Sequence, residues 1–200
     1  MRITRRKNMI KIIINLPKRI ERLKRSIENI NAFFKSEVDL VVSAGVVMEN
    51  TTHGVREAHK NAVRIAKNNG EKMALIFEDD IIFRGDALDY FNELVKNLPE
   101  DFEIVLFGVY SGKIERTESK YFDRIGKFSG LQMYLINETA YDKILSYNGN
   151  APIDHWIGSN LKCYISKKHF SYQIDGYSDN AKTKTSYNLG VLNNFKEFFY

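Results

Sequence analysis

The sequence predicts an α/β fold with a largely parallel central sheet. Short apolar or β-branched segments alternate with helical segments over residues 10–107, which is typical of parallel sheets covered by helices. The chain has 200 residues, of which 44% are hydrophobic, including 13 Phe and 11 Tyr. This length and composition suit one compact domain over residues 1–200 with a sizeable core.

Strands and helices alternate in the first half of the chain. Ile10–Ile14 is short and β-branched, as in a buried strand, and Pro17 ends it. Apolar side chains then recur at helical spacing from Ile20 to Phe34, so a helix is expected over 18–35. By the same criteria, further strands are expected at 38–43, 73–77 and 103–107, and further helices from Gly54 to the stop at 68–70 and over 87–98.

The second half is less regular. Residues 109–127 are polar and rich in turn formers, and they predict a mobile loop with room for a short hairpin. Residues 176–188 are rich in Ser, Thr, Asn and Lys, and they predict a second flexible loop. Strands are expected at 131–136, 164–165 and 170–174, and helices at 138–147, 154–161 and 189–200.

The charge is unevenly distributed. Residues 1–35 carry 11 basic and 2 acidic side chains, a net charge of +9, and the remaining residues carry 19 and 23, a net charge of −4. A basic tail over 1–8 on a mildly acidic body argues against nucleic acid as a partner, because nucleic-acid binding needs basic charge across a folded face. One alternative remains a nucleic-acid binder, suggested by the overall pI of about 9.1.

No apolar run is long enough for a transmembrane helix, and no small-residue cleavage site follows the basic start. A cytoplasmic location is therefore expected. The single cysteine, Cys163, excludes an internal disulfide and any zinc site built from paired cysteines.

Two polar clusters follow predicted strands, at Asn15–Arg19 and at Glu78-Asp79-Asp80. Parallel sheets bind ligands at the carboxyl ends of their strands, so both clusters are candidate ligand contacts. Side chains alternate in extended backbone, so Glu78 and Asp80 are expected on one side and Asp79 on the other. Carboxylates on one side suit Mn²⁺ or Mg²⁺, and a solvated acidic turn is the alternative.

Six segments, in a shared order, resemble those of one enzyme family. They are Ile14–Arg22, Gly54–His59, Leu75–Asp80, Leu131–Asn137, Pro152–Asp154, and Gln173 followed by Ser178-Asp179. Together they cover most of residues 10–180 and resemble glycosyltransferase family 25, the lipooligosaccharide and collagen galactosyltransferases. The chain departs from the family pattern at Val55, which stands in place of a cysteine, and at Ala58, which stands in place of a serine.

The resemblance implies a three-layer fold of GT-A type with a Rossmann-like N-terminal half. It also implies a UDP-sugar donor, carrying galactose or glucose, a divalent cation (Mn²⁺ or Mg²⁺) and inversion at the anomeric carbon. The acceptor would be a hydroxyl on a glycan or on a collagen-like hydroxylysine. The oligomeric state is left open by the sequence.

Site roles follow from the same resemblance. Donor-binding roles fall to Asn15, Leu16, Arg19, His59, Glu78 and Asp79. Asp80 and Asp179 are the candidate metal ligands. Inversion needs a base for the acceptor proton, and Asp154 is the candidate, with His155 as its rival. Asp154 could instead, or in addition, cap the short helix that follows.

Two other classes of function stay open. A nucleotidyltransferase would use a similar acidic pair, although the chain lacks a glycine-rich phosphate loop near its N-terminus. A non-catalytic carbohydrate-binding or scaffold protein could retain the same fold. In the enzyme, loops 109–127 and 176–188 are expected to close over the donor and exclude water.

Overall fold

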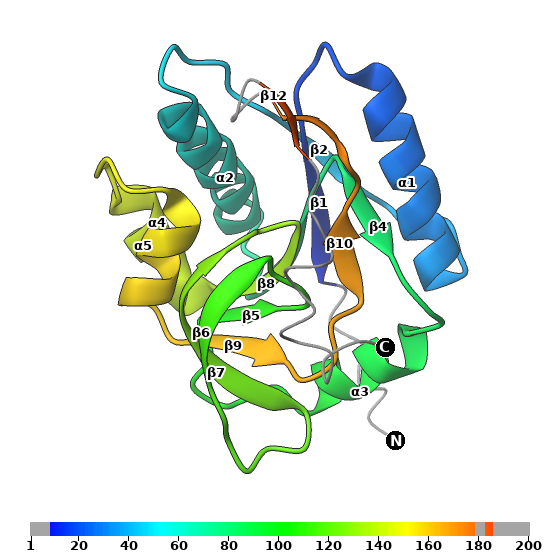
Figure 1. The fold of residues 1–200 in the computed structure, drawn as a ribbon, viewed down its shortest axis with the longest axis vertical. Coiled ribbons are helices and arrows are strands. Elements are labelled where there is room, and N and C mark those ends of the chain that lie inside the picture. The colour runs from blue at the N-terminus through cyan, green and yellow to red at the C-terminus, as the bar shows by residue number, and fades with distance from the viewer. Residues whose placement is uncertain (1–8, 179–182, 186–200) are drawn as a thin grey trace.

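The computed structural model describes residues 9–178 and 183–185, and its main element is an eight-stranded sheet. The strands of this sheet are β1 (Ile10–Asn15), β2 (Val41–Ala44), β3 (Met73–Glu78), β5 (Ile104–Leu106), β6 (Ser111–Glu115), β7 (Phe122–Ser129), β8 (Met133–Asn137) and β9 (Cys163–Ser166). Their order across the sheet is β2-β1-β3-β8-β5-β9-β7-β6 (Figure 1). Two small antiparallel pairs accompany it: β4 (Ile81–Phe83) with β10 (Ser171–Gln173), and β11 (Gly176–Ser178) with β12 (Thr183–Thr185).

The sheet is mainly parallel in strand direction. β1 is parallel to both of its neighbours, β2 and β3, and β5 is parallel to β9. β8 and β7 run against their neighbours, so six of the eight strands point the same way. The expected fold class, a mixed α/β architecture with a large central sheet, is confirmed.

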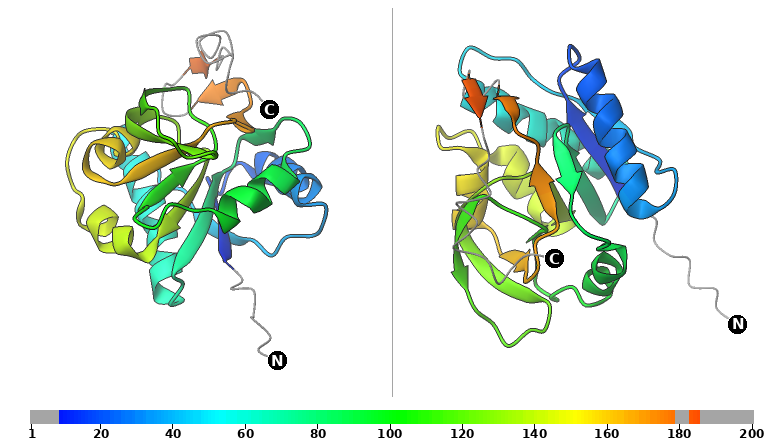
Figure 2. Two further views of the ribbon diagram at one scale, coloured as in Figure 1. Left: turned by 90° about the horizontal axis from the view of Figure 1, so that it is seen from below. Right: turned by 45° about the vertical axis from the view of Figure 1, so that its right-hand side comes forward.

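Helices cover both faces of the sheet, which gives three layers (Figures 1 and 2). The helices are α1 (Ile20–Phe34), α2 (Thr51–Asn68), α3 (Leu88–Lys96), α4 (Tyr141–Ser146) and α5 (Ile153–Asn160), with a 3₁₀ turn at Glu138–Ala140. One core lies between the sheet and α2, α4 and α5, and a second lies between the sheet and α1 and α3. Alternate residues of β1 and β3 contribute to opposite cores: Ile12 and Ile76 to the first, Ile13 and Leu75 to the second.

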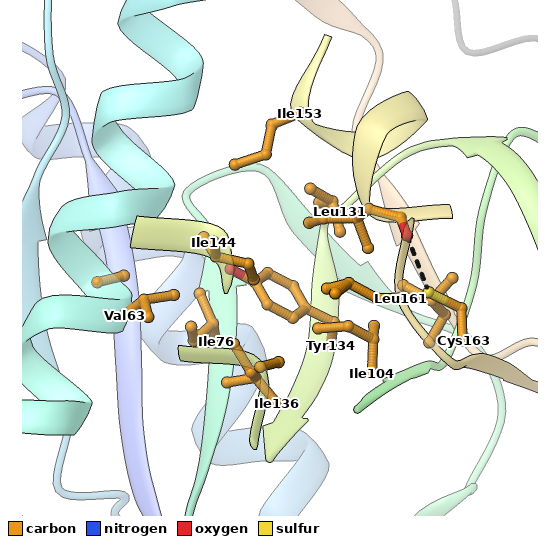
Figure 3. Close-up of a cluster of buried hydrophobic side chains, with 14 of the residues drawn as sticks. Val63, Ile76, Ile104, Leu131, Tyr134, Ile136, Ile144, Ile153, Leu161 and Cys163 are labelled. Carbon is orange, nitrogen blue, oxygen red and sulfur yellow. Dashed lines mark hydrogen bonds between the residues drawn. The ribbon is translucent and has the colours of Figure 1, made fainter. Parts of the chain in front are cut away.

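The first core surrounds Tyr134, whose side chain is fully buried (Figure 3). Cys163 lies at the edge of this cluster, with its Sγ 3.6 Å from the Ile157 carbonyl oxygen. Burial raises the pKa of the Cys163 thiol to about 12. The thiol therefore stays protonated at neutral pH and acts as a core side chain, because the thiolate is the reactive form.

The helix expected to open at Gly54 begins earlier, at Thr51. Asn50 is its N-cap, and its side chain accepts a hydrogen bond from the His53 N–H at 3.3 Å. Gly54 has a different role. A Cβ at this position would lie 2.6 Å from the Val46 carbonyl oxygen, so glycine allows the loop after β2 to pack against the helix.

The expectation of a mobile loop over 109–127 is wrong, whereas the short hairpin for which that expectation left room is present. This segment forms the β6–β7 hairpin, and β7 pairs with β9 in the main sheet. The fully buried Asp123 fixes the connecting turn, accepting hydrogen bonds from the Arg116 side chain (3.1 Å) and the Thr117 N–H (2.9 Å). Lys167 adds an ion pair at 3.4 Å. A segment built into the sheet in this way cannot serve as the expected closing loop.

Other expectations fall partly or wholly outside the described residues. Within 176–188, residues 176–178 and 183–185 form the antiparallel pair β11–β12. These residues are therefore strand rather than loop. The basic tail 1–8, Asp179 and the expected helix 189–200 lie outside the described part of the chain. Within residues 9–178 and 183–185, no helix has the length and apolarity needed to cross a bilayer.

Candidate functional site

The two polar clusters predicted from the sequence meet at one edge of the sheet. β1 and β3 are parallel neighbours, and Ile14 pairs with Glu78, so Asn15–Arg19 and Glu78-Asp79-Asp80 follow adjacent strand ends. After β1 the chain crosses to β2 on one side, and β3 then returns to the other side of β1. Because α1 and α2 cover opposite faces, their first turns diverge and leave a crevice at this position.

A cavity of about 810 Å³ occupies this crevice. Its volume lies within the usual range for small-molecule sites, roughly 300–1,000 Å³. The predicted residues that line it are Leu16, Arg19, His59, Glu78, Asp79, Asp80, Asp154 and His155. The structure therefore brings the predicted donor, metal and base residues to one cavity, apart from Asn15, which is buried beside it, and Asp179.

Arg22, in the first turn of α1, and Arg19, directly before that helix, contact the acidic pair Asp79 and Asp80. Arg22 Nη2 lies 2.5 Å from Asp80 Oδ2, and Arg22 Nε lies 3.5 Å from Asp79 Oδ1. Arg19 Nη1 lies 3.6 Å from the same Asp79 oxygen. Both aspartates thus face Arg22, because the backbone turns between β3 and β4. The expectation that Asp79 points away from Asp80 is wrong for this reason.

Backbone contacts hold the acidic turn against α1. Ser26 donates to the Asp79 carbonyl at 2.6 Å, and Asn29 donates to the Ile81 carbonyl at 3.1 Å. On the other side, the Ile174 N–H donates to the Asp80 carbonyl at 2.9 Å. The position of both carboxylates is therefore fixed by the protein rather than by solvent.

Burial changes the acidity of both aspartates. It raises the pKa of Asp80 to about 7, helped by the negative charge of Glu78 and opposed by Arg22. Burial also raises the pKa of Asp79, opposed by Arg22 and Arg19. Burial thus disfavours the ionised form of both carboxylates, and a bound cation would favour it.

Glu78 takes part in a hydrogen-bond network on the side of α2. His59 Nε2 lies 3.1 Å from Glu78 Oε1, and His59 Nδ1 lies 3.0 Å from the Tyr134 hydroxyl. Gln173 donates to the other Glu78 oxygen and also hydrogen-bonds to Asp80. Glu78 and Asp80 therefore share a partner, as expected for side chains on one side. Both carboxylate oxygens of Glu78 therefore have hydrogen-bond partners.

Asn15 and Leu16 form the end of β1. The Asn15 side-chain amide donates to the Leu16 carbonyl at 2.9 Å, and the backbone carbonyl oxygen of Asn15 accepts from the Gly45 N–H at 2.8 Å. The Leu16 N–H hydrogen-bonds to the Asp79 carboxylate. Asn15 thereby shapes the turn, whereas the Leu16 side chain lines the cavity.

Asp154 and His155 enter the cavity from the first turn of α5. Pro152 is the N-cap of that helix, so Asp154 is not the cap. Asp154 Oδ2 accepts from the Gly130 N–H at 3.2 Å, and Oδ1 accepts from the His155 N–H at 2.8 Å. His155 Nε2 lies 3.1 Å from Ser129 Oγ.

Some contacts that define the site were not predicted. Ser26, Ser129, Gly130 and Tyr134 each hold a predicted residue in place. These residues lie far from their partners in sequence, and serine, glycine and buried tyrosine carry no distinctive spacing. Tyr134 had a partial signal, since an aromatic side chain with a hydroxyl in a buried strand usually has a hydrogen-bond partner.

The acidic pair can hold a divalent cation only together with other ligands. Among residues 9–178 and 183–185, no cluster of three or more Asp, Glu, His or Cys side chains is arranged for a metal ion. Asp79 Oδ2 and Asp80 Oδ1 are buried and have no hydrogen-bond partner in that part of the chain. Mg²⁺ is commonly held by one or two carboxylates plus phosphates and water, and the two free oxygens fit this arrangement.

Comparison with known proteins gives distant resemblances of fold. No protein-family model and no curated protein matches the chain. Solved structures similar to it include a glycosyltransferase involved in glycosylation of the major capsid of PBCV-1 (11% identity, 72% of this chain and 69% of that chain, TM-score 0.47). Another is a mutant of a Drosophila β1,4-galactosyltransferase 7 in complex with manganese, UDP-Gal and xylobiose (9% identity, 91% and 77%, TM-score 0.48).

A third is a putative glucose-1-phosphate thymidylyltransferase from Bacillus anthracis in complex with a sucrose (11% identity, 82% and 89%, TM-score 0.43). At these identities and TM-scores the three structures do not assign an activity. The family suggested by the sequence motifs stays a prediction.

Proposed function

We propose that this protein is a metal-dependent inverting glycosyltransferase, related to glycosyltransferase family 25, that moves galactose or glucose from a UDP-sugar to an acceptor hydroxyl. One observation carries the proposal. A single cavity at the carboxyl ends of β1 and β3 is lined by the cationic Arg19 and Arg22, the acidic pair Asp79 and Asp80, and the carboxylate of Asp154. The reaction needs a site that binds the donor diphosphate, a bound cation, and a group that takes the proton of the acceptor hydroxyl.

The donor diphosphate would lie against Arg19 and Arg22. Both side chains line the cavity, and a guanidinium offers paired N–H donors that match phosphate oxygens. Leu16 provides an apolar contact beside them, and Val47 and Met48, both exposed, add apolar surface at the same cavity. This combination suits a nucleoside diphosphate, which has one anionic and one largely apolar part.

Asp80 and Asp79 are the residues that would hold Mn²⁺ or Mg²⁺, and Asp179, outside the described residues, is a further candidate. When bound, the cation supplies positive charge that stabilises the diphosphate as it leaves. The raised pKa of Asp80 fits this role, because a cation favours the ionised form of a buried carboxylate.

Asp154 would accept the proton of the attacking hydroxyl. In a single displacement, the acceptor oxygen bonds to the anomeric carbon, the bond from that carbon to the diphosphate oxygen breaks, and UDP leaves. The proton passes to the Asp154 carboxylate. Two N–H donors orient that carboxylate, and His155, held by Ser129, is the alternative base.

Activity with a panel of nucleotide sugars tests the proposal. The full chain is incubated with UDP-galactose, UDP-glucose and other nucleotide sugars, with Mn²⁺ or with chelator, and released UDP is measured with and without glycan or hydroxylysine acceptors. We expect metal-dependent release from one UDP-sugar. If no nucleotide sugar is bound or hydrolysed with metal present, the transferase proposal is wrong.

A matched pair of variants distinguishes the loss of a metal ligand from the loss of one negative charge elsewhere on the protein. Asp80→Asn removes one ionisable carboxylate and is expected to abolish metal-dependent donor binding. Asp86→Asn is the control, because Asp86 is exposed and pairs with Lys35 on the surface. Loss of donor binding in both variants, or in neither, would contradict the role of Asp80. A parallel reaction with nucleoside triphosphate and sugar 1-phosphate, read out as pyrophosphate, tests the nucleotidyltransferase alternative.

A further inference from the structure

Arg22 contacts the two carboxylates that would hold a divalent cation. Its guanidinium spans the acidic pair, with Nη2 on Asp80 and Nε facing Asp79. Its side chain is 19% exposed, whereas those of Asp79 and Asp80 are 8% and 9% exposed. Arg22 thus directly contacts and neutralises Asp80.

A guanidinium and a metal ion cannot share these carboxylates without strong repulsion. Like charges at contact distance in a buried site repel much more than in water, because little solvent screens them. Asp80 Oδ2 is already occupied by Arg22, and the free oxygens, Asp80 Oδ1 and Asp79 Oδ2, belong to the same two carboxyl groups. A cation at those oxygens would therefore lie within a few ångströms of the guanidinium.

The structure provides space into which Arg22 can turn. A second cavity, of about 750 Å³, lies on the side of α1 and β4. Both cavities are lined by the same five residues at their common wall: Lys18, Arg19, Arg22, Asp79 and Asp80. The Arg22 side chain therefore borders free volume on both sides of the acidic pair. An arginine has enough rotatable bonds to leave Asp80 without a movement of α1.

We propose that Arg22 is an exchangeable counter-cation: it neutralises Asp79 and Asp80 while the site holds no metal, and it transfers to the nucleotide diphosphate when metal and donor bind together. This inference rests on the proposed function. The phosphates replace the carboxylates as the anionic partner of Arg22, so its charge stays paired throughout. Metal and nucleotide binding are then coupled through one side chain.

The exchange predicts that Arg22 has opposite effects on the binding of Mn²⁺ and on the binding of UDP. Arg22 competes with a bare cation, so removing it should strengthen Mn²⁺ binding in the absence of nucleotide. Arg22 assists the diphosphate, so removing it should weaken UDP binding in the presence of saturating Mn²⁺. A residue that merely orients the metal ligands would weaken both. Coupling between two bound ligands typically changes affinity at least about fivefold.

Three variants of the full chain test the exchange. Arg22→Met keeps the length of the side chain without charge, and Arg22→Lys keeps the charge without the planar fork. Arg64→Met is the control, because Arg64 is exposed on α2 and lines neither cavity. Mn²⁺ affinity is measured without nucleotide from the paramagnetic signal of free Mn²⁺, and UDP affinity is measured by calorimetry at saturating Mn²⁺.

We expect Arg22→Met to lower the Kd for Mn²⁺ and to raise the Kd for UDP, each at least about fivefold, with both Kd values unchanged in Arg64→Met. Arg22→Lys should shift the Kd for Mn²⁺ in the same direction by less, and it carries the test if Arg22→Met does not fold. Unchanged or weaker Mn²⁺ binding in the Arg22 variants would overturn the inference and leave the transferase proposal standing. Absence of Mn²⁺ binding in the unmodified protein, with UDP present, would overturn both.

Discussion

The backbone N–H of Gly130 donates a hydrogen bond to Asp154 in the wall of the cavity, with 3.2 Å between the nitrogen and Oδ2. Gly130 follows β7, and Asp154 lies in the first turn of α5. The close packing of these two elements keeps the pair together. A Cβ at Gly158 in α5 would lie 2.4 Å from the Gly126 carbonyl oxygen in β7. The candidate base is thus aligned by a strand rather than by a mobile loop.

Asp154→Asn should remove sugar transfer and spare donor binding. The amide cannot take a proton from the acceptor hydroxyl, and general-base catalysis contributes typically about 10²–10⁴-fold. Initial rates with saturating UDP-sugar, together with UDP affinity, check this expectation. His155→Gln provides the comparison. If that variant loses transfer while Asp154→Asn keeps it, His155 is the base.

Gly130→Ala should misplace Asp154. Gly130 has φ +113°, which side chains rarely adopt, and an added Cβ would lie 2.9 Å from Gln132 Oε1. Backbone strain of this kind costs about 1–3 kcal/mol of unfolding free energy. We expect that loss in urea denaturation, together with reduced transfer at unchanged UDP affinity. Gly126→Ala is the control, because its Cβ would have no neighbour closer than 3.7 Å; an equal loss in that variant would refute the explanation.

Tyr134→Phe should destabilise the protein more than Tyr141→Phe. Tyr134 hydrogen-bonds to the buried His59, so its loss leaves a polar group unsatisfied, at about 1–3 kcal/mol. The Tyr141 hydroxyl is also buried but has no hydrogen-bond partner among the described residues. Its removal should be neutral or stabilising. Chemical denaturation of the two variants measures the difference, and equal effects would show that the His59 contact contributes nothing.

His169 should make the protein less stable in acid. Burial lowers the pKa of His169 from 6.5 to about 4, so the folded protein keeps the imidazole neutral at pH 5. The unfolded chain takes up a proton below its own pKa, and stability therefore falls as the pH is lowered, by about 2 kcal/mol between pH 7 and pH 5.

The variant His169→Gln tests this origin of the acid sensitivity. It should be less stable than the unmodified protein at pH 7, because a buried ring is replaced, and it should lose less stability on going to pH 5. Urea denaturation at both pH values gives the two differences. If His169→Gln loses as much unfolding free energy between pH 7 and pH 5 as the unmodified protein, His169 is not the source of the acid sensitivity.

The sequence predicted the local elements of the N-terminal half well. β1, α1 and β3 lie within two residues of their expected bounds, because β-branched runs, helical spacing and Pro17 are local signals. The meeting of the two polar clusters was also predictable, since parallel strands place their carboxyl ends together. The expected alternation of side chains after Glu78 was wrong, because the strand ends there and the chain turns.

The second half depends on pairings between distant segments. The β6–β7 hairpin was expected to be a mobile loop, since its polar sequence gave no sign that β7 pairs with β9 or that Asp123 is buried beneath it. β8 runs antiparallel between β3 and β5, an arrangement set by long-range packing. Likewise, the contact of Arg22 with both aspartates depends on how α1 is placed on the sheet, which local patterns do not specify.

The hairpin that ends the sheet also limits how the protein can self-associate. β6 is the outer strand, with the pairing to β7 shifted in register between Gly112 and Ile114. Its sequence places Lys113 and Glu115 along the same short strand. An approaching strand from another molecule would find an interrupted ladder and charged side chains instead of a flat apolar edge. The irregular pairing therefore protects this side of the sheet from edge-to-edge aggregation.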